Sequence, residues 1–308
     1  MTADQVRQAM AEYKEKHSIS QNQLAKLMGY ENASVLSRFN NGTYDNDNTV
    51  IEKWELFARR DEQVRGRIKK QAFSKISTSQ QVIDLLDLCH GGGEFGVVYG
   101  DPGVGKTMAI QQYAKENKDA IVITIRPTNA SVAGINEMIA EKLGIKETVS
   151  RRITEAVITK LKGTKRVIVI DEAQHLKAKV VNHLRSIVDA TEDEETGERI
   201  GICLVGNDEI FHELRIKAKA NYSQVADRIT YWQHLVAKEV KKEDIALMFG
   251  SELTEDVLDM LYKVSTQNSV RKMVMLVQKT TSAFNIDLKE LTASRLAAVC
   301  KNMKVRVA

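Results

Sequence analysis

The stretch YGDPGVGKT, residues 99–107, limits the folds open to this chain more than any other feature of its sequence. It matches the pattern G-x-x-x-x-G-K-[ST] without a mismatch, and that pattern is typical of a loop that wraps around nucleotide phosphates. Such a loop needs a strand before it and a helix after it. Residues 95–100 (FGVVYG) read as a short buried strand, and residues 106–117 read as a helix. The sequence therefore predicts an α/β fold built around a phosphate-binding P-loop.

The residue types in this loop each have a chemical task. Glycines let successive backbone N–H groups turn toward phosphate oxygens. Lys106 brings positive charge to the β and γ phosphates, and the Thr107 hydroxyl is a ligand for Mg²⁺. A helix that begins near Gly105 adds the positive end of its dipole. We therefore expect ATP with Mg²⁺ to be bound by Gly100, Asp101, Pro102, Gly103, Val104, Gly105, Lys106, Thr107 and Met108.

A second motif, RVIVIDEAQHL, supplies the carboxylates that hydrolysis needs. Its β-branched run, residues 167–170, is typical of a strand covered on both faces. Asp171 follows at the carboxyl end, where open α/β sheets bind their ligands, and we expect it to hold Mg²⁺ through water. Glu172 comes next and is the group expected to polarise the attacking water. Together with the P-loop, this motif predicts ATP hydrolysis.

Length, charge and cysteine usage limit the class of protein further. A chain of 308 residues indicates two domains, or one domain with appendages. A net charge of +4 is too small to prove a nucleic-acid partner by itself. The three cysteines lie far apart without metal-binding spacing, which indicates a reducing, cytoplasmic location. The sequence has no signal peptide and no apolar run near 18 residues, so we expect no membrane span.

The first 58 residues are expected to form a small helical domain. Residues 18–42 predict a short helix, a tight turn at Gly29 and a second short helix over 33–40. This is the plan of a helix-turn-helix, whose second helix enters the DNA major groove, and the pattern L-A-x-x-x-G resembles that of Cro-type phage repressors. The resemblance implies DNA contacts from Asn32, Ser34, Ser37 and Arg38. A helical hairpin used for protein contact is the alternative.

The rest of the chain divides by composition into three parts. Residues 59–75 hold seven Lys or Arg against two acids and are interpreted as a basic linker, either a solvated hinge or a non-specific phosphate contact. Residues 76–238 alternate strands and helices, which predicts a parallel sheet with helices on both faces. Residues 239–308 show helical patterns only. Expected strands are 95–100, 120–125, 167–171, 200–208 and 230–236, and expected helices 106–117, 131–143, 150–162 and 176–190.

From about residue 76 to residue 285 these motifs resemble the AAA+ ATPases. Asn207, at the end of the strand in CLVGN, matches the polar sensor-1 residue that helps to place the attacking water. Arg228, just before the last strand, resembles the arginine finger that reaches the γ-phosphate of a neighbouring subunit. Arg271, at the start of a helix in NSVRKMV, resembles sensor 2. The resemblance implies catalytic roles for Glu172 and these three residues.

DEAQHL after a strand, an N-terminal helix-turn-helix and a helical C-terminal end together resemble the B proteins of Mu-like phages and prophages. This family consists of target-capture ATPases of DNA transposition, which act in the bacterial cytoplasm. The resemblance implies ATP-dependent, largely non-specific binding of double-stranded DNA and self-assembly into helical filaments. It also implies delivery of target DNA to a transposase, stimulation of strand transfer, and release after hydrolysis.

Other readings of the sequence stay open at this point. Arg151 and Arg152, ahead of the helix that precedes the Asp171 strand, are a further candidate DNA contact, and a solvated helix start is the alternative. The ATPase motifs are also compatible with a helicase loader or replication initiator. A helix-turn-helix regulator that uses ATP as a ligand is the third possibility; it predicts a defined operator and a dimer.

Overall fold

The computed structural model describes residues 1–65, 73–216, 228–251 and 253–306. The chain forms two compact units, Met1–Lys70 and Gln71–Ala308.

The first unit is helical in its described part and packs around one small apolar core. Its helices are α1 (Ala3–His17), α2 (Gln21–Leu27), α3 (Ser34–Asn40) and α4 (Asp47–Arg65). Ser20 begins α2 with a capping box, in which its hydroxyl accepts from the Gln23 N–H and the Gln23 side chain accepts from the Ser20 N–H. Leu24, Leu36 and Phe39 have no exposed surface and fix α2 against α3.

Helix α4 extends to Arg65, into the range that composition suggested as a linker. Residues 59–65 are mostly Arg, Glu and Gln, which are good helix formers, so a basic segment can continue a helix already begun. The rings of Trp54 and Phe57 pack against Tyr13 of α1 and anchor the helix further back. Residues 66–72 of the expected linker lie outside the described residues.

The second unit is built on a five-stranded parallel sheet in the order β2-β3-β4-β1-β5. The strands are β1 (Phe95–Gly100), β2 (Ile121–Thr124), β3 (Val167–Asp171), β4 (Gly201–Val205) and β5 (Tyr231–Leu235). Every residue of β3 and β4 is buried, as expected of central parallel strands. Because all strands are parallel, their carboxyl ends, including Gly100 and Asp171, lie at one edge of the sheet.

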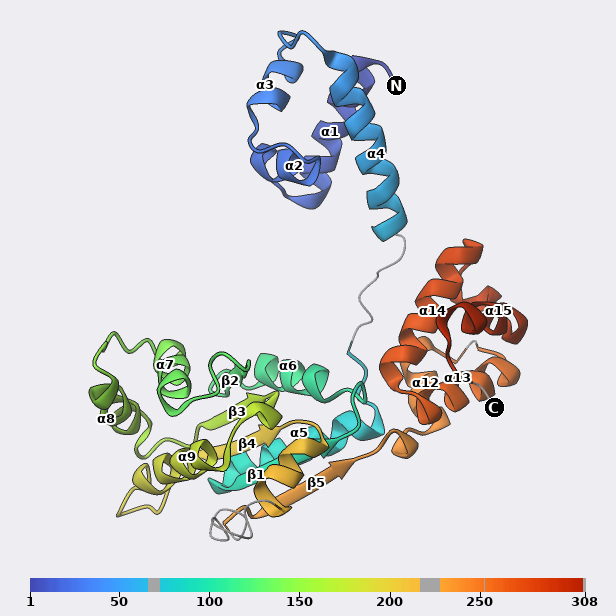
Figure 1. Ribbon diagram of the computed structural model, residues 1–308. Coiled ribbons are helices and arrows are strands. Elements are labelled where there is room, and N and C mark those ends of the chain that lie inside the picture. The colour runs from blue at the N-terminus through green and yellow to red at the C-terminus, as the bar shows by residue number, and fades with distance from the viewer. Residues whose placement is uncertain (66–72, 217–227, 252, 307–308) are drawn as a thin grey trace. The chain divides into compact units, whose positions relative to one another are not determined.

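Helices cover both faces of this sheet (Figure 1). One face packs on α5 (Ser77–Gly92) and α6 (Lys106–Glu116), and the other packs on α7 (Val132–Leu143), α8 (Ser150–Leu161), α9 (Ala178–Ala190) and α10 (Asp208–Phe211). Successive strand residues alternate between the two cores, so that Val97 belongs to one and Val98 to the other. A short 3₁₀ turn, η1 (Ala173–His175), follows β3, and a π-helical turn, η2 (His212–Ile216), follows α10.

A helical bundle follows β5 and has its own apolar core. Its elements are η4 (Ala237–Glu239), α12 (Lys242–Phe249), α13 (Glu255–Gln267), α14 (Val270–Phe284), η5 (Leu288–Glu290) and α15 (Ala293–Met303). The buried Asp244 carboxylate accepts from the Ser77 N–H and hydroxyl at 2.8 and 3.0 Å, and from the Lys241 N–H at 2.8 Å. It thereby ties the start of α12 to the start of α5. Within the described ranges no helix is both long and apolar enough to cross a membrane.

Candidate functional site

The P-loop lies between the end of β1 and the start of α6. Its Lys106 ammonium donates to the carbonyl oxygens of Gly100 and Asp101, both at 2.8 Å, so the side chain curls back over the loop. Burial lowers the pKa of Lys106, and nearby carboxylates, Asp171 foremost, offset part of that effect. The Lys106 ammonium is thus held over its own loop, and phosphate binding by these residues stays a prediction.

Thr107 and Asp171 meet at the carboxyl edge of the sheet, although 64 residues separate them. The Thr107 hydroxyl donates to Asp171 Oδ2 at 3.0 Å, and Asp171 Oδ1 accepts from the Glu172 N–H at 3.0 Å. The Asp171 side chain is 5% exposed, and its burial raises its pKa despite the two hydrogen bonds that lower it. A hydroxyl beside a carboxylate offers hard oxygen ligands, so these residues fit Mg²⁺ bound with phosphates.

Glu172 stands at the exposed rim of this edge, next to the sensor candidate. Its backbone adopts φ 58°, in the left-handed region. The side-chain amide of Gln174 donates to Glu172 Oε2 at 2.5 Å and accepts from the Asn207 N–H at 3.3 Å. Asn207 follows β4 as the N-cap residue of α10, and its Oδ1 accepts from the Glu209 N–H. Sequence reasoning overlooked Gln174, although the DEAQ motif contains it.

Two further residues hold the loop in place, and the motif does not reveal their roles. The buried Thr78 hydroxyl of α5 donates to the Val104 carbonyl oxygen at 2.7 Å. Asp101 donates its N–H to the Leu235 carbonyl oxygen at 2.9 Å and accepts from the Ala237 N–H at 2.8 Å through Oδ2. The P-loop is therefore bonded on one side to α5 and on the other to the segment that leads into the C-terminal bundle.

The start of α14 approaches the P-loop closely at Gly103. The Arg271 N–H donates to the Gly103 carbonyl oxygen at 3.0 Å. Gly103 has φ 79°, and a Cβ there would come within 3.0 Å of Arg271 Cβ and 3.1 Å of Ser269 Cβ. Only glycine fits both the backbone angle and the space. The structure thus brings Arg271 to the loop, while the Met108 side chain on α6 is 43% exposed.

Arg228 lies apart from these residues. It precedes the amino end of β5, whereas the P-loop lies at the carboxyl ends of the strands. Its side chain is 61% exposed and forms an ion pair with Asp189 of α9 at 3.7 Å. An exposed ion pair of this kind contributes little to stability, about 0–1 kcal/mol. Arg228 is therefore not part of the nucleotide site of its own chain.

The candidate DNA contacts are exposed but fall on two separate units. In the first unit Asn32, Ser34, Ser37 and Arg38 are all exposed around the start and outer face of α3. Asn32 Oδ1 accepts from the Ser34 N–H at 3.0 Å, and the Arg38 guanidinium lies 5.4 Å from the centre of the Tyr44 ring. Arg151 and Arg152 are exposed in the first turn of α8 in the second unit. Arg151 also pairs with Glu155 at 3.9 Å.

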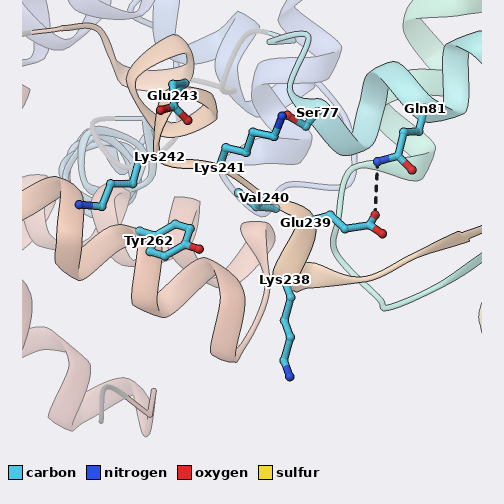
Figure 2. A pocket seen from close by; sticks show the side chains of 9 residues that line it. All are labelled: Ser77, Gln81, Lys238, Glu239, Val240, Lys241, Lys242, Glu243 and Tyr262. Atoms are coloured by element: carbon cyan, nitrogen blue, oxygen red, sulfur yellow. Dashed lines mark hydrogen bonds between the residues drawn. The ribbon is translucent and has the colours of Figure 1, made fainter.

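A pocket of about 660 Å³ opens where α5 meets the C-terminal bundle (Figure 2). It is lined by Ser77, Gln81, Lys238, Glu239, Val240, Lys241, Lys242, Glu243 and Tyr262. The Gln81 amide donates to Glu239 at 3.3 Å, drawn as the dashed line in Figure 2. Hydrogen bonds to Asp259 and Glu255 raise the pKa of Lys242 to about 12, so that lysine is already paired. The pocket marks the junction between the sheet domain and the bundle, and sequence analysis did not predict it.

The sheet order, the P-loop, the paired Thr107 and Asp171, and the helical bundle joined to the loop define a P-loop protein of the AAA+ ATPase class. A family model described as "AAA domain" matches residues 89–214. The solved structure of the Aeropyrum pernix ORC2 protein, in ADPNP–ADP complexes, aligns with a TM-score of 0.55 over 77% of this chain and 71% of that one. At 14% identity this likeness concerns the fold alone.

Sequence relatives narrow the class to one family. The Mu-like prophage FluMu DNA transposition protein B of Haemophilus influenzae is 30% identical over 257 residues, which span 80% of this chain and 86% of that protein. The ATP-dependent target DNA activator B of Escherichia phage Mu is 30% identical over 224 residues, or 70% and 67% of the two chains. The chain belongs to the family of Mu-like phage and prophage DNA transposition B proteins.

Proposed function

We propose that this chain is an ATP-dependent, largely non-specific DNA-binding protein that assembles on target DNA and hands it to a transposase. In this proposal it stimulates strand transfer, and ATP hydrolysis controls its release from the DNA. The role is proposed because the phage Mu relative is an ATP-dependent target DNA activator. The observation in this chain that supports it most is the Thr107–Asp171 contact with Glu172 beside it, which equips the protein to hydrolyse ATP.

The chemistry follows from what each side chain can do at phosphate. Backbone N–H groups of the loop and the Lys106 ammonium bind the β and γ phosphates. Thr107 and Asp171 would hold Mg²⁺, which neutralises charge on the phosphate oxygens. Glu172 accepts a proton from the water that attacks the γ-phosphorus. The bond from that phosphorus to the β–γ bridging oxygen breaks, and ADP leaves with that oxygen. Asn207 and Arg271 would orient the water and the nucleotide.

DNA binding is assigned to exposed cations and polar groups rather than to a base-reading surface. Arg38 is the one cation on α3, the helix proposed to enter the major groove. With one cation, this helix offers few groups for base readout, which depends on several side chains acting together, so the proposal takes DNA binding to be largely independent of sequence. Arg151 and Arg152 add positive charge on the ATPase unit, where nucleotide state can influence it.

Electron microscopy with random-sequence DNA tests this function directly. The protein should coat the duplex with ATP and leave it bare without nucleotide. Lys106→Ala should leave the DNA bare in both conditions, and ATP-dependent strand transfer by a cognate transposase should disappear with it. Protein that binds one defined operator as a dimer, with no coating of other DNA, would refute the proposal in favour of a regulator.

A further inference from the structure

Gln174 joins two parts of the nucleotide site that come from different strands. It sits in η1 after β3, and its side-chain amide reaches Glu172 on one side and the backbone of Asn207, after β4, on the other. Glu172 is the expected acceptor of the water proton, and Asn207 is the residue expected to help place the attacking water. The Gln174 side chain is therefore the hydrogen-bonded link between them within the described part of the site.

The direction of this link is fixed by the donors and acceptors at its ends. A carboxylate only accepts and a backbone N–H only donates, so the amide must turn its NH₂ to Glu172 and its oxygen to Asn207. The reversed amide would set oxygen against oxygen at one end and N–H against N–H at the other. An isosteric glutamate in place of Gln174 could satisfy only the Asn207 end.

The backbone of Gly206 lies close to Gln174, and this close approach allows the hydrogen bond between Gln174 and Asn207. Gly206 precedes Asn207, and a Cβ at Gly206 would come within 2.8 Å of Gln174 Oε1 and 3.1 Å of the Gln174 backbone nitrogen. The turn after β4 can come this close to η1 only because residue 206 has no side chain. Glu172 itself adopts the left-handed φ of 58°, which sets its side chain at the rim beside Gln174.

We propose that Gln174 is a positioning residue that holds the Glu172 carboxylate in its catalytic orientation and ties that orientation to the position of Asn207. The inference rests on the proposed ATPase function and adds a residue to its mechanism. Gln174 acts through Glu172, so its loss frees the carboxylate to rotate without changing how ATP binds. A misplaced catalytic group can cost on the order of 10²-fold in rate.

Steady-state ATPase kinetics of Gln174→Ala, with nucleotide affinity measured separately by a fluorescent ATP analogue, test the proposal. We expect kcat to fall about 10-fold or more, while KM and nucleotide affinity change by less than about twofold. Gln174→Glu keeps the size and the bond to Asn207 but lacks the donor to Glu172, so it should lose rate as well. Gln112→Ala is the matched control, because Gln112 donates to Glu116 at 2.6 Å on α6, away from Glu172.

A double-mutant cycle separates positioning from a structural role. In the Glu172→Gln background, Gln174→Ala should change the residual rate by less than about twofold, because the group it positions is gone. An unchanged kcat in Gln174→Ala, or an equal loss of rate in both backgrounds, would overturn the proposal. Normal turnover by Glu172→Gln would instead overturn the hydrolytic role of Glu172, and with it the positioning role of Gln174, while leaving ATP hydrolysis to another base.

Discussion

Lys106 and Asp171 carry opposite charges that their own burial disfavours. Burial lowers the pKa of the lysine and raises the pKa of the aspartate, and in both residues it outweighs the attraction between them. Desolvated charges of this kind are typical of sites that act on a charged ligand. A triphosphate with Mg²⁺ supplies charge of the opposite sign to each group, which is the chemistry that the motif predicts.

Glu172→Gln should separate ATP binding from hydrolysis. The amide keeps the shape of the side chain but cannot accept the water proton, so turnover should fall about 10²-fold or more. The variant should still bind ATP, should coat DNA, and should leave it slowly after dilution, as followed by DNA fluorescence anisotropy. Glu194→Gln, in the exposed acidic turn after α9, should behave as the unmodified protein. Rapid turnover by Glu172→Gln would mean that another group accepts the proton from the attacking water.

At the scale of residues, the sequence predicted those groups whose roles depend on local spacing. Lys106 and Thr107 follow from the loop pattern, and Asp171 with Glu172 follow from the end of an apolar strand. Gln174 and Thr78 did not follow, because their roles depend on contacts with Asn207 and Val104 that only the folded chain creates. The binding and catalytic roles of all these residues, like those of Arg228 and of the DNA contacts, stay predictions.

At the scale of elements, the five strands were predictable because apolar runs bounded by turns mark buried parallel strands. Helix α5 was not predicted from the sequence. Its N-cap residue, Ile76, provides no side-chain cap, and the Ser77 N–H is instead satisfied by Asp244, 167 residues away. A helix start that depends on so distant a partner leaves no local signal. The π-helical turn η2 was also not predicted.

His183 of α9 should make the stability of the second unit depend on pH. Its Nε2 contacts Asn136 Oδ1 of α7 at 2.9 Å, and Asn136 donates to Thr154 of α8 at 2.7 Å. Burial lowers the pKa of His183 below its ordinary value. Because the folded-state pKa is depressed, neutral His183 contributes to the free energy of unfolding above about pH 6.5, and this contribution is lost as pH falls through the folded pKa.

Urea unfolding at pH 7.5 and pH 5.5 measures this effect. The wild-type protein should lose more stability between the two values than His183→Gln, whose amide can still donate to Asn136 but does not titrate. His17→Gln, on α1 of the first unit, is the control and should leave the loss unchanged in the second unit. An identical pH dependence in His183→Gln and wild type would contradict the assignment.

At the scale of the whole molecule, the proposal joins a DNA-binding helical unit to a nucleotide switch. Binding of ATP and binding of DNA are then coupled by one free energy, and the coupling is reciprocal. Arg228 lies away from the P-loop of its own chain. We therefore propose that it acts on the ATP bound by a neighbouring subunit. A head-to-tail assembly could deliver it to the next P-loop and would form either a ring or an open helix.

Mixing two inactive variants tests whether the ATPase site is shared. Arg228→Ala and Lys106→Ala should each be nearly inactive on DNA, since a trans arginine is worth on the order of 10³ to 10⁵ in rate. Mixed together, they should recover activity wherever an intact P-loop faces an intact Arg228. Asp189→Asn is the control, because it removes the ion pair and keeps the arginine. Normal hydrolysis by Arg228→Ala would exclude the shared site at this residue.

The salt dependence of DNA affinity tests the proposed contact residues. Each lost phosphate contact should reduce the slope of log K against log salt by about 1. We expect this from Arg38→Ala, Arg151→Ala and Arg152→Ala. Lys16→Ala, on α1, and Lys160→Ala, near the far end of α8, are controls with the same loss of charge. Unchanged slopes in all three arginine variants would show that these arginines do not contact phosphates and that the DNA-binding surface lies elsewhere.

The most direct test of the central claim is the affinity for a random-sequence duplex with ATP and without nucleotide, at one fixed salt concentration. Coupling of the usual size predicts that ATP tightens DNA binding by about tenfold or more, and that DNA tightens ATP binding by the same factor. Lys106→Ala should bind DNA with the weak affinity in both conditions. Equal DNA affinities with and without ATP in the unmodified protein would contradict the account.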